Sequence, residues 1–497
     1  MLLPLLLLAA AAAPTGDLEG SIKKLTDVLS IARSEAADPV NGEAAMYQGA
    51  IPGMLRRLDP HSVFFDPGQY QQLQQMEKSE RKGFGTVVSV LPGRVFVLQA
   101  LPGTPSGRAG LAPGDEIVAI NNIALSRLDF EQLVGFLQES RQRTARLDVR
   151  RPDNVRILQF VLNPELLDTP SVDRAFLIEP DIGYIRVASF EPLTTRQLKQ
   201  AIEKLGGDKL GGLIVDLRDN PGGVVQAAVE IAGFFLKPGQ RVLSVKGRAV
   251  KDEEIDVPKT ANPYHFPMAV LMNGKSASCS EIVAGALQDH DRAAIVGEPS
   301  FGKGLVQSIF PLSSTTAVAL TTSFYYTPSG RSIQKPLSSG QLDFAKPREK
   351  FKTDSGRTVL GGGGIQPDIE AHMAEPTQLR VALEASGTIT AFASAQKGKI
   401  EVTEAFQVTP AMLDEFEGFA SQRRIQPSVS EWLRERDWIQ SRLKQEIVTQ
   451  TLGVEKGDEV EMKRDDQVRA ALTAIKKQRA ASVNESPVST AAAATPR

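Results

Sequence analysis

Three alternating serines, Ser276, Ser278 and Ser280, and a lysine further along the chain, Lys303, are residues whose types and spacing could do chemistry. The serines follow a short apolar run at 269–272 that favours a strand, and they precede a helical apolar pattern that begins near Glu281. Serine at such a place is an ordinary helix N-cap. A strand-to-helix turn can also present a serine nucleophile and helix N-terminal amides to the same carbonyl. The local pattern leaves both roles open.

A serine hydroxyl is a weak nucleophile and needs a neighbouring base. The chain has four histidines, and the one nearest the serines in sequence, His290, lies near the end of the predicted helix, roughly 15 Å away along its axis. A lysine amine can act as the base where an apolar environment favours its neutral form. Lys303, set among Phe301, Leu305 and glycines, is the candidate.

The stretch GEPSFGKG at 297–304 comes within one residue of a phosphate-binding P-loop. The hydroxyl residue that would ligate magnesium is replaced by Gly304, and Glu298 adds a negative charge that would oppose a polyphosphate. A nucleotide site is therefore disfavoured, and the lysine stays available as a base.

The length and charge of the chain limit its class. Its 497 residues predict three or four domains, and 57 Lys+Arg against 59 Asp+Glu give a net charge of -2. A nucleic-acid partner would normally leave a basic footprint, so a peptide or protein partner is favoured. Cys279 is the only cysteine, which excludes an intrachain disulfide and a lipid-modified N-terminal cysteine.

Residues 1–16 resemble a secretory signal peptide, with an apolar run at 2–13 that is too short to span a bilayer and ends in small residues. No Lys or Arg precedes the run, and a disordered or wrongly assigned start is the alternative. We expect export to the periplasm or cell envelope.

Hydrophobic periodicity predicts a multidomain α/β protein. Helical spacing over 17–75 predicts a small helical domain, and short β-rich runs with one helix predict a compact α+β module over 76–165. Strands that alternate with longer helices predict a layered α/β core over 166–375. A charged helical region is expected over 376–479, with Thr409 as an N-cap, and a disordered tail over 480–497.

The stretch SASCSE at 276–281 resembles the signature S-A-S-A-S-E of the C-terminal processing peptidases, also called tail-specific proteases. The resemblance implies that Ser278 is the nucleophile, that Lys303, 25 positions later, is its base, and that Gln307 orients the lysine. It also implies a crotonase-like α/β core with an inserted PDZ domain. Further blocks that match the family are LDPHSVFFDP at 58–67, DLRDNPGG at 216–223, TPSGRSIQ at 327–334 and GGGGIQPDI at 361–369.

The family resemblance assigns DLRDNPGG to the oxyanion hole. Glycines let backbone amides approach a carbonyl, so Gly222 and Gly223 are expected donors, with the amide of Cys279 as another; an ordinary turn is the alternative. Cys279 stands where the family usually has alanine, and we expect a packed, inert thiol rather than a competing nucleophile. Asp289 is expected to support structure.

The module over 76–165 resembles a PDZ domain. Gly83, Phe84, Gly85 and Thr86 match the carboxylate-binding loop of that domain, whose amides capture a chain terminus while the next strand accepts the peptide. The helix after Asp129 would line the site, and its apolar residues, Leu133, Phe136 and Leu137, fit substrate contact and core equally well.

Together these features predict an exported serine endopeptidase that recognises the C-terminal segments of proteins and cuts with a Ser-Lys dyad. No metal, nucleotide or other cofactor is implied, and an envelope adaptor protein and a homo-oligomer stay open as partners. The main alternative is a catalytically silent PDZ adaptor or scaffold in the cell envelope. A second is acyl-CoA chemistry on a crotonase-like core, which the PDZ module and the lysine disfavour.

Overall fold

The computed structural model describes residues 17–78, 82–91, 93–101, 103–151, 154, 156–167, 170–338, 341–342 and 348–484. The predicted signal peptide and residues 485–497 of the predicted tail lie outside the described residues. The chain divides into two units. The first holds Met1–Gln75, Gln307–Thr321 and Leu337–Asp343, and the second holds the rest.

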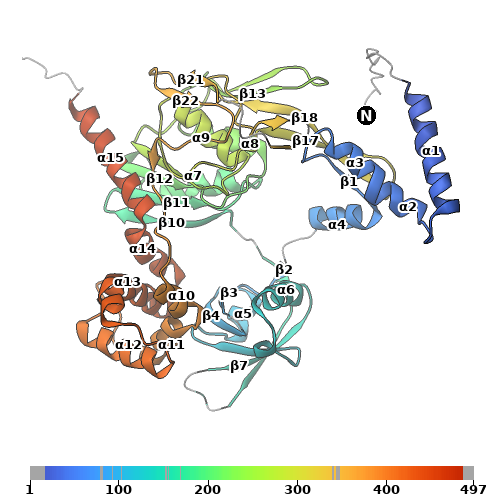
Figure 1. Cartoon of the computed structure of the whole chain (residues 1–497). Coiled ribbons are helices and arrows are strands. Elements are labelled where there is room, and N and C mark those ends of the chain that lie inside the picture. Colours follow the sequence, from blue (N-terminus) through green and yellow to red (C-terminus); the bar gives the residue numbers. More distant parts are fainter. Residues whose placement is uncertain are drawn as a thin grey trace, which may run out of the picture. The chain divides into compact units, whose positions relative to one another are not determined.

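The first unit is mainly helical (Figure 1). Its first helix is capped by Asp17, whose side chain accepts a hydrogen bond from Gly20 N. Asp59 accepts hydrogen bonds from the amides of His61 and Ser62, which fixes the turn where the third helix ends. The elements are α1 (Leu18–Glu35), α2 (Gly42–Ala44), the π-helix η1 (Ala45–Ala50), α3 (Ile51–Arg56), β1 (Val63–Phe65) and α4 (Pro67–Lys78), and β1 pairs with the first part of β18 (Ala317–Tyr326).

The second unit begins with a β-rich module in which β3 is an edge strand of the sheet β3-β4-β5-β7-β8. Its helix α6 starts at a capping box between Asp129 and Gln132, and Leu133 is buried in the module's core. The elements are β2 (Lys82–Gly83), β3 (Thr86–Leu91), β4 (Arg94–Ala100), α5 (Pro105–Ala109), β5 (Glu116–Ile120), β6 (Ile123–Ala124), η2 (Leu125–Arg127), α6 (Phe130–Ser140), β7 (Ala145–Arg150), β8 (Leu158–Leu162) and β9 (Glu165–Leu166).

A six-stranded sheet, β10-β11-β12-β15-β16-β23, forms the α/β core of the second unit, and all its pairs after β10-β11 are parallel. The apolar run at 212–216 forms β12, whose residues are all buried, as expected of a strand covered on both faces. Successive side chains of a strand point to opposite faces. Accordingly, Leu213 and Val215 pack with helices α7 (Thr194–Leu205), α8 (Val225–Gly233) and α9 (Cys279–Asp289), whereas Ile214 packs with α15 (Asp466–Asn484).

The elements of this core are β10 (Val172–Glu179), β11 (Ile182–Val187), α7 (Thr194–Leu205), η3 (Gly207–Lys209), β12 (Gly212–Asp216), α8 (Val225–Gly233), β15 (Met268–Met272), α9 (Cys279–Asp289), β16 (Ala294–Gly297) and β23 (Ile369–Glu370). The remaining strands in the part of the chain that the structure describes are β13 (Arg241–Lys246), β14 (Glu253–Asp256), β17 (Leu305–Pro311), β19 (Leu337–Ser338), β20 (Gln341–Leu342), β21 (Lys350–Lys352) and β22 (Thr358–Leu360).

The region after Glu375 is helical and has a core of its own, in which Phe392 and Phe416 pack edge to face. Thr409 caps α12 as predicted, and its hydroxyl accepts a hydrogen bond from Met412 N. The elements are α10 (Gln378–Ala385), α11 (Thr388–Gln396), α12 (Pro410–Gln422), α13 (Val429–Leu452), α14 (Val454–Arg464) and α15 (Asp466–Asn484). Because α15 continues to Asn484, it runs into the segment for which we expected disorder; its alanines and lysines favour a helix. Within the described ranges, no helix is both long and apolar enough to cross a membrane.

Candidate active site

The site is built where three neighbouring parallel strands, β12, β15 and β16, reach their carboxyl ends. Parallel strands end at the same edge of a sheet, so the loops that follow them meet there. Phe301 N, after β16, donates to Ser276 O, after β15. Ala277 N donates in turn to Asn220 O, after β12. These backbone bonds tie together the loops that carry Ser278, Lys303 and the DLRDNPGG segment.

Ser278 occupies a strained backbone conformation at the turn from β15 into α9, with φ 54° and ψ −112°. Non-glycine residues rarely have a positive φ, and such strain persists only where the surroundings fix it. Ser276 helps to fix the turn that carries Ser278, because its hydroxyl donates a hydrogen bond to Leu217 O at 2.7 Å. The helix begins at Cys279, two residues before the Glu281 that we expected, so the amide of Cys279 lies in its first turn.

The two glycines of DLRDNPGG approach the loop that carries Ser278 closely. A Cβ atom on Gly222, which has φ +101°, would lie 2.8 Å from Ser278 Cβ and 3.0 Å from Cys279 N. Gly222 N already donates to Asn220 Oδ1 at 2.8 Å, so this amide, one of the expected oxyanion donors, is occupied. No oxygen atom of a described residue accepts a hydrogen bond from Gly223 N or Cys279 N, although both N–H groups lie near the Cys279 sulfur. Gly222 thus contributes the space for a close approach, and Gly223 and Cys279 supply the open donors.

Cys279 is fully buried beside Ser278, and its thiol donates to Gly223 O at 3.2 Å. Burial raises the pKa of this thiol to about 11. The thiol is therefore un-ionised at neutral pH and is a weak nucleophile there. Its hydrogen bond helps to fix the carbonyl of Gly223.

Glu281 joins the serine loop to the lysine loop. It is fully buried, and its Oε2 accepts hydrogen bonds from Ser278 N at 2.8 Å and from Lys303 N at 2.9 Å. Its Oε1 accepts from Gly302 N at 2.7 Å and from the Ser300 hydroxyl. Burial raises the pKa of this carboxyl, although the four hydrogen bonds favour its charged form. The backbones of the two candidate catalytic residues are thus fixed by one oxygen atom.

The other sequence candidates have defined partners. Gln307 lies in the first unit, where its Nε2 donates to His61 O at 2.7 Å. Both ring nitrogens of His290 are engaged, Nδ1 with Asp354 Oδ2 at 2.7 Å and Nε2 with Arg241 O at 2.8 Å. The carboxylate of Asp289 is bound within the protein: its Oδ1 accepts from Arg331 at 2.8 Å.

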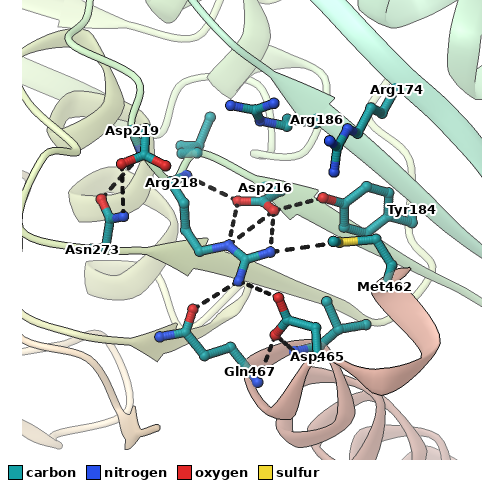
Figure 2. A network of polar contacts seen from close by, with 12 residues as sticks. Arg174, Tyr184, Arg186, Asp216, Arg218, Asp219, Asn273, Met462, Asp465 and Gln467 are labelled. Atoms are coloured by element: carbon teal, nitrogen blue, oxygen red, sulfur yellow. Dashed lines mark hydrogen bonds and ion pairs between the residues drawn. The ribbon is translucent and has the colours of Figure 1, made fainter. Parts of the chain in front are cut away.

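Sequence reasoning gave no role to Arg218, which lies at the centre of a buried polar network (Figure 2). Its guanidinium donates to both oxygens of Asp216 and to Asp465 and Gln467. Burial alone would lower the pKa of this guanidinium, but Asp216 and Asp465 outweigh it and raise the pKa. Glu281 was expected only to mark the start of a helix and to belong to the family motif. In both cases a signal was present in the sequence. Arg218 directly follows the largely apolar run at 212–217, Glu281 directly precedes the apolar run at 282–287, and a charged residue that is buried must find partners.

The PDZ-type loop lies directly before the edge strand β3. Gly83 pairs with Glu165, and Gly85 has φ +74°, where a Cβ atom would lie 2.3 Å from the Thr104 side chain. No described residue accepts a hydrogen bond from Phe84 N or Gly85 N, and Thr86 begins β3. These two amides and the outer edge of β3 can therefore receive a peptide.

The sequence left three apolar residues of α6 as candidates for either substrate contact or core. Leu133 belongs to the core. Phe136 and Leu137 are half-buried and pack against that core.

Comparison with known proteins identifies the family. The model of peptidase family S41 matches residues 181–342, and a PDZ domain model matches residues 96–151. A carboxy-terminal-processing protease of Bartonella bacilliformis is 34% identical over 66% of this chain and 77% of its own length. A carboxyl-terminal-processing protease of Synechocystis sp. is 32% identical over 58% of this chain and 68% of its own length.

Among solved structures, the photosystem II D1 C-terminal processing protease aligns with 71% of this chain and 87% of its own, with 23% identity and a TM-score of 0.41. The family models and the two relatives above lead to one conclusion: this chain belongs to the carboxy-terminal-processing proteases of peptidase family S41 and is a serine peptidase.

Proposed function

We propose that this protein cleaves protein substrates with a dyad of Ser278 and Lys303 and selects them by their C-termini through its PDZ domain. The hydrogen bonds of Glu281 carry the first half of the proposal. Since Ser278 N and Lys303 N both donate to its Oε2, at 2.8 and 2.9 Å, the two nitrogens lie within about 5.7 Å of each other, the sum of the two bond lengths. A lysine side chain can span such a distance.

The chemistry follows from the positions of these groups. The neutral amine of Lys303 accepts the hydroxyl proton of Ser278 as Oγ bonds to the substrate carbonyl carbon. The carbonyl oxygen becomes an oxyanion, which the open amides of Gly223 and Cys279 stabilise. The ammonium then returns the proton to the leaving amine as the C–N bond breaks. Water hydrolyses the acyl-enzyme by the same steps, which restores Ser278.

Substitutions of the dyad test this assignment. Ser278→Ala and Lys303→Ala should each remove nearly all cleavage of a protein substrate, because they remove the nucleophile and its base. His290→Ala is the matched control, since the His290 ring bonds to Asp354 and Arg241, and it should keep most of the activity. Loss of activity in a folded His290→Ala protein would point to a Ser-His arrangement. Full proteolysis by Ser278→Ala would contradict the proposal.

The open amides of Phe84 and Gly85, next to the edge strand β3, support recognition of a chain terminus. A terminal carboxylate gains roughly 1.5–3 kcal/mol from each charge-assisted hydrogen bond. Amidation of the terminus removes the charge, so we expect capture to weaken tenfold or more, mainly as a higher KM. Equal cleavage of one substrate with free and with amidated termini would show that the loop does not recognise the carboxylate.

A silent PDZ adaptor is distinguished by the same experiments. It would bind the free terminus more tightly than the amidated one but would show no cleavage that depends on Ser278.

A further inference from the structure

Two residues near the C-terminus, Asp465 and Gln467, contact the turn that carries the proposed oxyanion donor. We infer that they are positioning residues for catalysis, which hold the DLRDNPGG turn in its active shape through the side chain of Arg218. This inference rests on the proposed Ser-Lys function, and it gives the junction of α14 and α15 a part in that chemistry.

The contacts between the turn and the C-terminal residues are short and buried (Figure 2). Nη1 of Arg218 donates to Asp465 Oδ2 at 2.6 Å and to Gln467 Oε1 at 2.9 Å, while Nε and Nη2 donate to Asp216. The side chains of Arg218 and Asp465 are only 10% and 7% exposed. Ion pairs shielded from water in this way are screened little by salt and fix the geometry of both partners.

Arg218 connects these contacts to the oxyanion turn because it lies at the start of that turn. It follows Asp216, the last residue of β12, by two positions, and Asp219, with φ 58°, comes next. The turn is also held by other contacts, among them the bond from Asp219 N to Asn273 Oδ1 (Figure 2). Asn220 O accepts from Ala277 N in the nucleophile loop, and Gly222 O accepts from Phe190 N.

The bond to Phe190 fixes one face of the peptide between Gly222 and Gly223. In a trans peptide the N–H points away from the C=O, so Gly223 N is directed away from Phe190. The direction of this N–H therefore depends on the path of the whole turn, and Asp465 and Gln467 support that path at its start, through Arg218.

Gln467 strengthens the link, because it joins two segments at once. Its Oε1 accepts from Arg218, and its Nε2 donates to Ala371 O at 2.7 Å. It is almost completely buried. An amide with both ends bound has a single orientation, which holds its oxygen toward the guanidinium.

Asp465 has a second role that the test must preserve. Its Oδ1 accepts from Gln467 N at 2.8 Å and from Val468 N at 3.0 Å, which caps the start of α15. Serine is an equally favoured N-cap but is too short to keep the bond to Arg218. Asp465→Ser therefore removes the ion pair and retains the cap. Lys476→Ala is the matched control: it breaks the contact of α15 with Glu179 on β10, away from the turn.

The experiment measures kcat and KM with a peptide substrate, and the inhibition constant of a peptide aldehyde of the same sequence. The Ser278 hydroxyl adds to such an aldehyde, and the former carbonyl oxygen then occupies the oxyanion site. Loss of one oxyanion donor costs about 100- to 1,000-fold in kcat, and a misdirected donor should cost part of that. For Asp465→Ser we expect kcat to fall and the inhibition constant to rise, both roughly tenfold, with KM within about twofold. Lys476→Ala should match the wild type in all three.

Unchanged kcat and aldehyde inhibition in Asp465→Ser, while Ser278→Ala is inactive, would overturn this inference and leave the proposed function intact. Equal losses in Asp465→Ser and Lys476→Ala would also overturn it, since they would indicate a general loss of stability. Proteolysis by Ser278→Ala would instead refute the proposed function itself. If Asp465→Ser does not fold, Gln467→Ala replaces it with the same expected signature at smaller amplitude, and wild-type values there would overturn the inference.

Discussion

Replacing Glu281 by glutamine should lower both the stability and the activity of the protein, and the four hydrogen bonds of the carboxylate predict by how much. Oε2 accepts hydrogen bonds from the amides of Ser278 and Lys303, and Oε1 accepts them from Gly302 N and the Ser300 hydroxyl. The single oxygen of glutamine can replace Oε2. Its NH₂ group then faces Ser300, whose hydroxyl can turn to accept, and Gly302, whose N–H is left without an acceptor.

The magnitude follows from this count. One buried donor without a partner costs about 1–3 kcal/mol, and two charge-assisted bonds that become neutral lose about 1 kcal/mol each. Burial raises the pKa of the Glu281 carboxyl, so removal of the charge recovers part of this cost. We expect a net loss of about 2–4 kcal/mol in the free energy of unfolding. Because Ser278 N and Lys303 N keep an acceptor, kcat should fall by only about tenfold, or about 1.4 kcal/mol.

Thermal or urea unfolding and peptide cleavage measure the two effects. Glu281→Ala should lower the free energy of unfolding much further, since it leaves four donors without an acceptor at about 1–3 kcal/mol each. This loss approaches the roughly 5–15 kcal/mol that stabilise a typical protein. Glu298→Gln, at a partly exposed carboxylate, is the control and should be neutral. A Glu281→Gln protein as stable and as active as the wild type would refute the argument, and so would a stably folded Glu281→Ala protein.

Three further predictions concern single residues. Gly222→Ala should lower kcat by about 100-fold or more, because its Cβ would lie 2.8 Å from Ser278 Cβ. Gly239→Ala is the control: Gly239 also has a positive φ, but no atom lies within 4 Å of its Cβ position, so this change should cost only about 1–2 kcal/mol of stability and no activity. An active Gly222→Ala enzyme would contradict the close approach. The kcat of Cys279→Ala should stay within about fivefold of the wild-type value, since the variant loses one weak hydrogen bond. In the wild type, iodoacetamide at pH 8 should label the thiol only when the protein is unfolded. Rapid labelling of the folded protein would refute the burial of the thiol. Burial raises the pKa of Asp458 to about 6, so the folded state binds this proton more tightly than the unfolded state, and the resulting stability is lost as pH rises from about 4 to 6. The unfolding free energy of Asp458→Asn, relative to wild type, should therefore increase between pH 4 and 6 and level off above; a constant difference would contradict the raised pKa.

Much of the local structure could be predicted from the sequence. The limits of β4 match the run RVFVLQA, and Thr409 caps α12 as its position before Pro410 suggested. These features depend on neighbouring residues, whose propensities are visible in the sequence. The start of α9 was expected two residues too late, because a serine strained by its tertiary neighbours cannot be distinguished from an ordinary N-cap by sequence.

The candidate site was less accessible to sequence reasoning. The spacing of Ser278 and Lys303 gains its meaning from a family resemblance, since 25 residues fix no distance in space. The occupied amide of Gly222 depends on how the Asn220 side chain folds back. Arg218 meets Asp465 across 247 residues of sequence, and no local pattern links the two.

Helix α15 covers one face of the central sheet. The side chains of Ile214, Leu271 and Val296 on that face pack with Val468 and Ile475 from α15. A ribosome delivers these strands long before it delivers α15, so the nascent chain must carry an uncovered apolar sheet face until α15 has been synthesised. Surfaces of this kind attract chaperones and favour aggregation. Early termination of translation should therefore yield an insoluble product rather than a smaller peptidase.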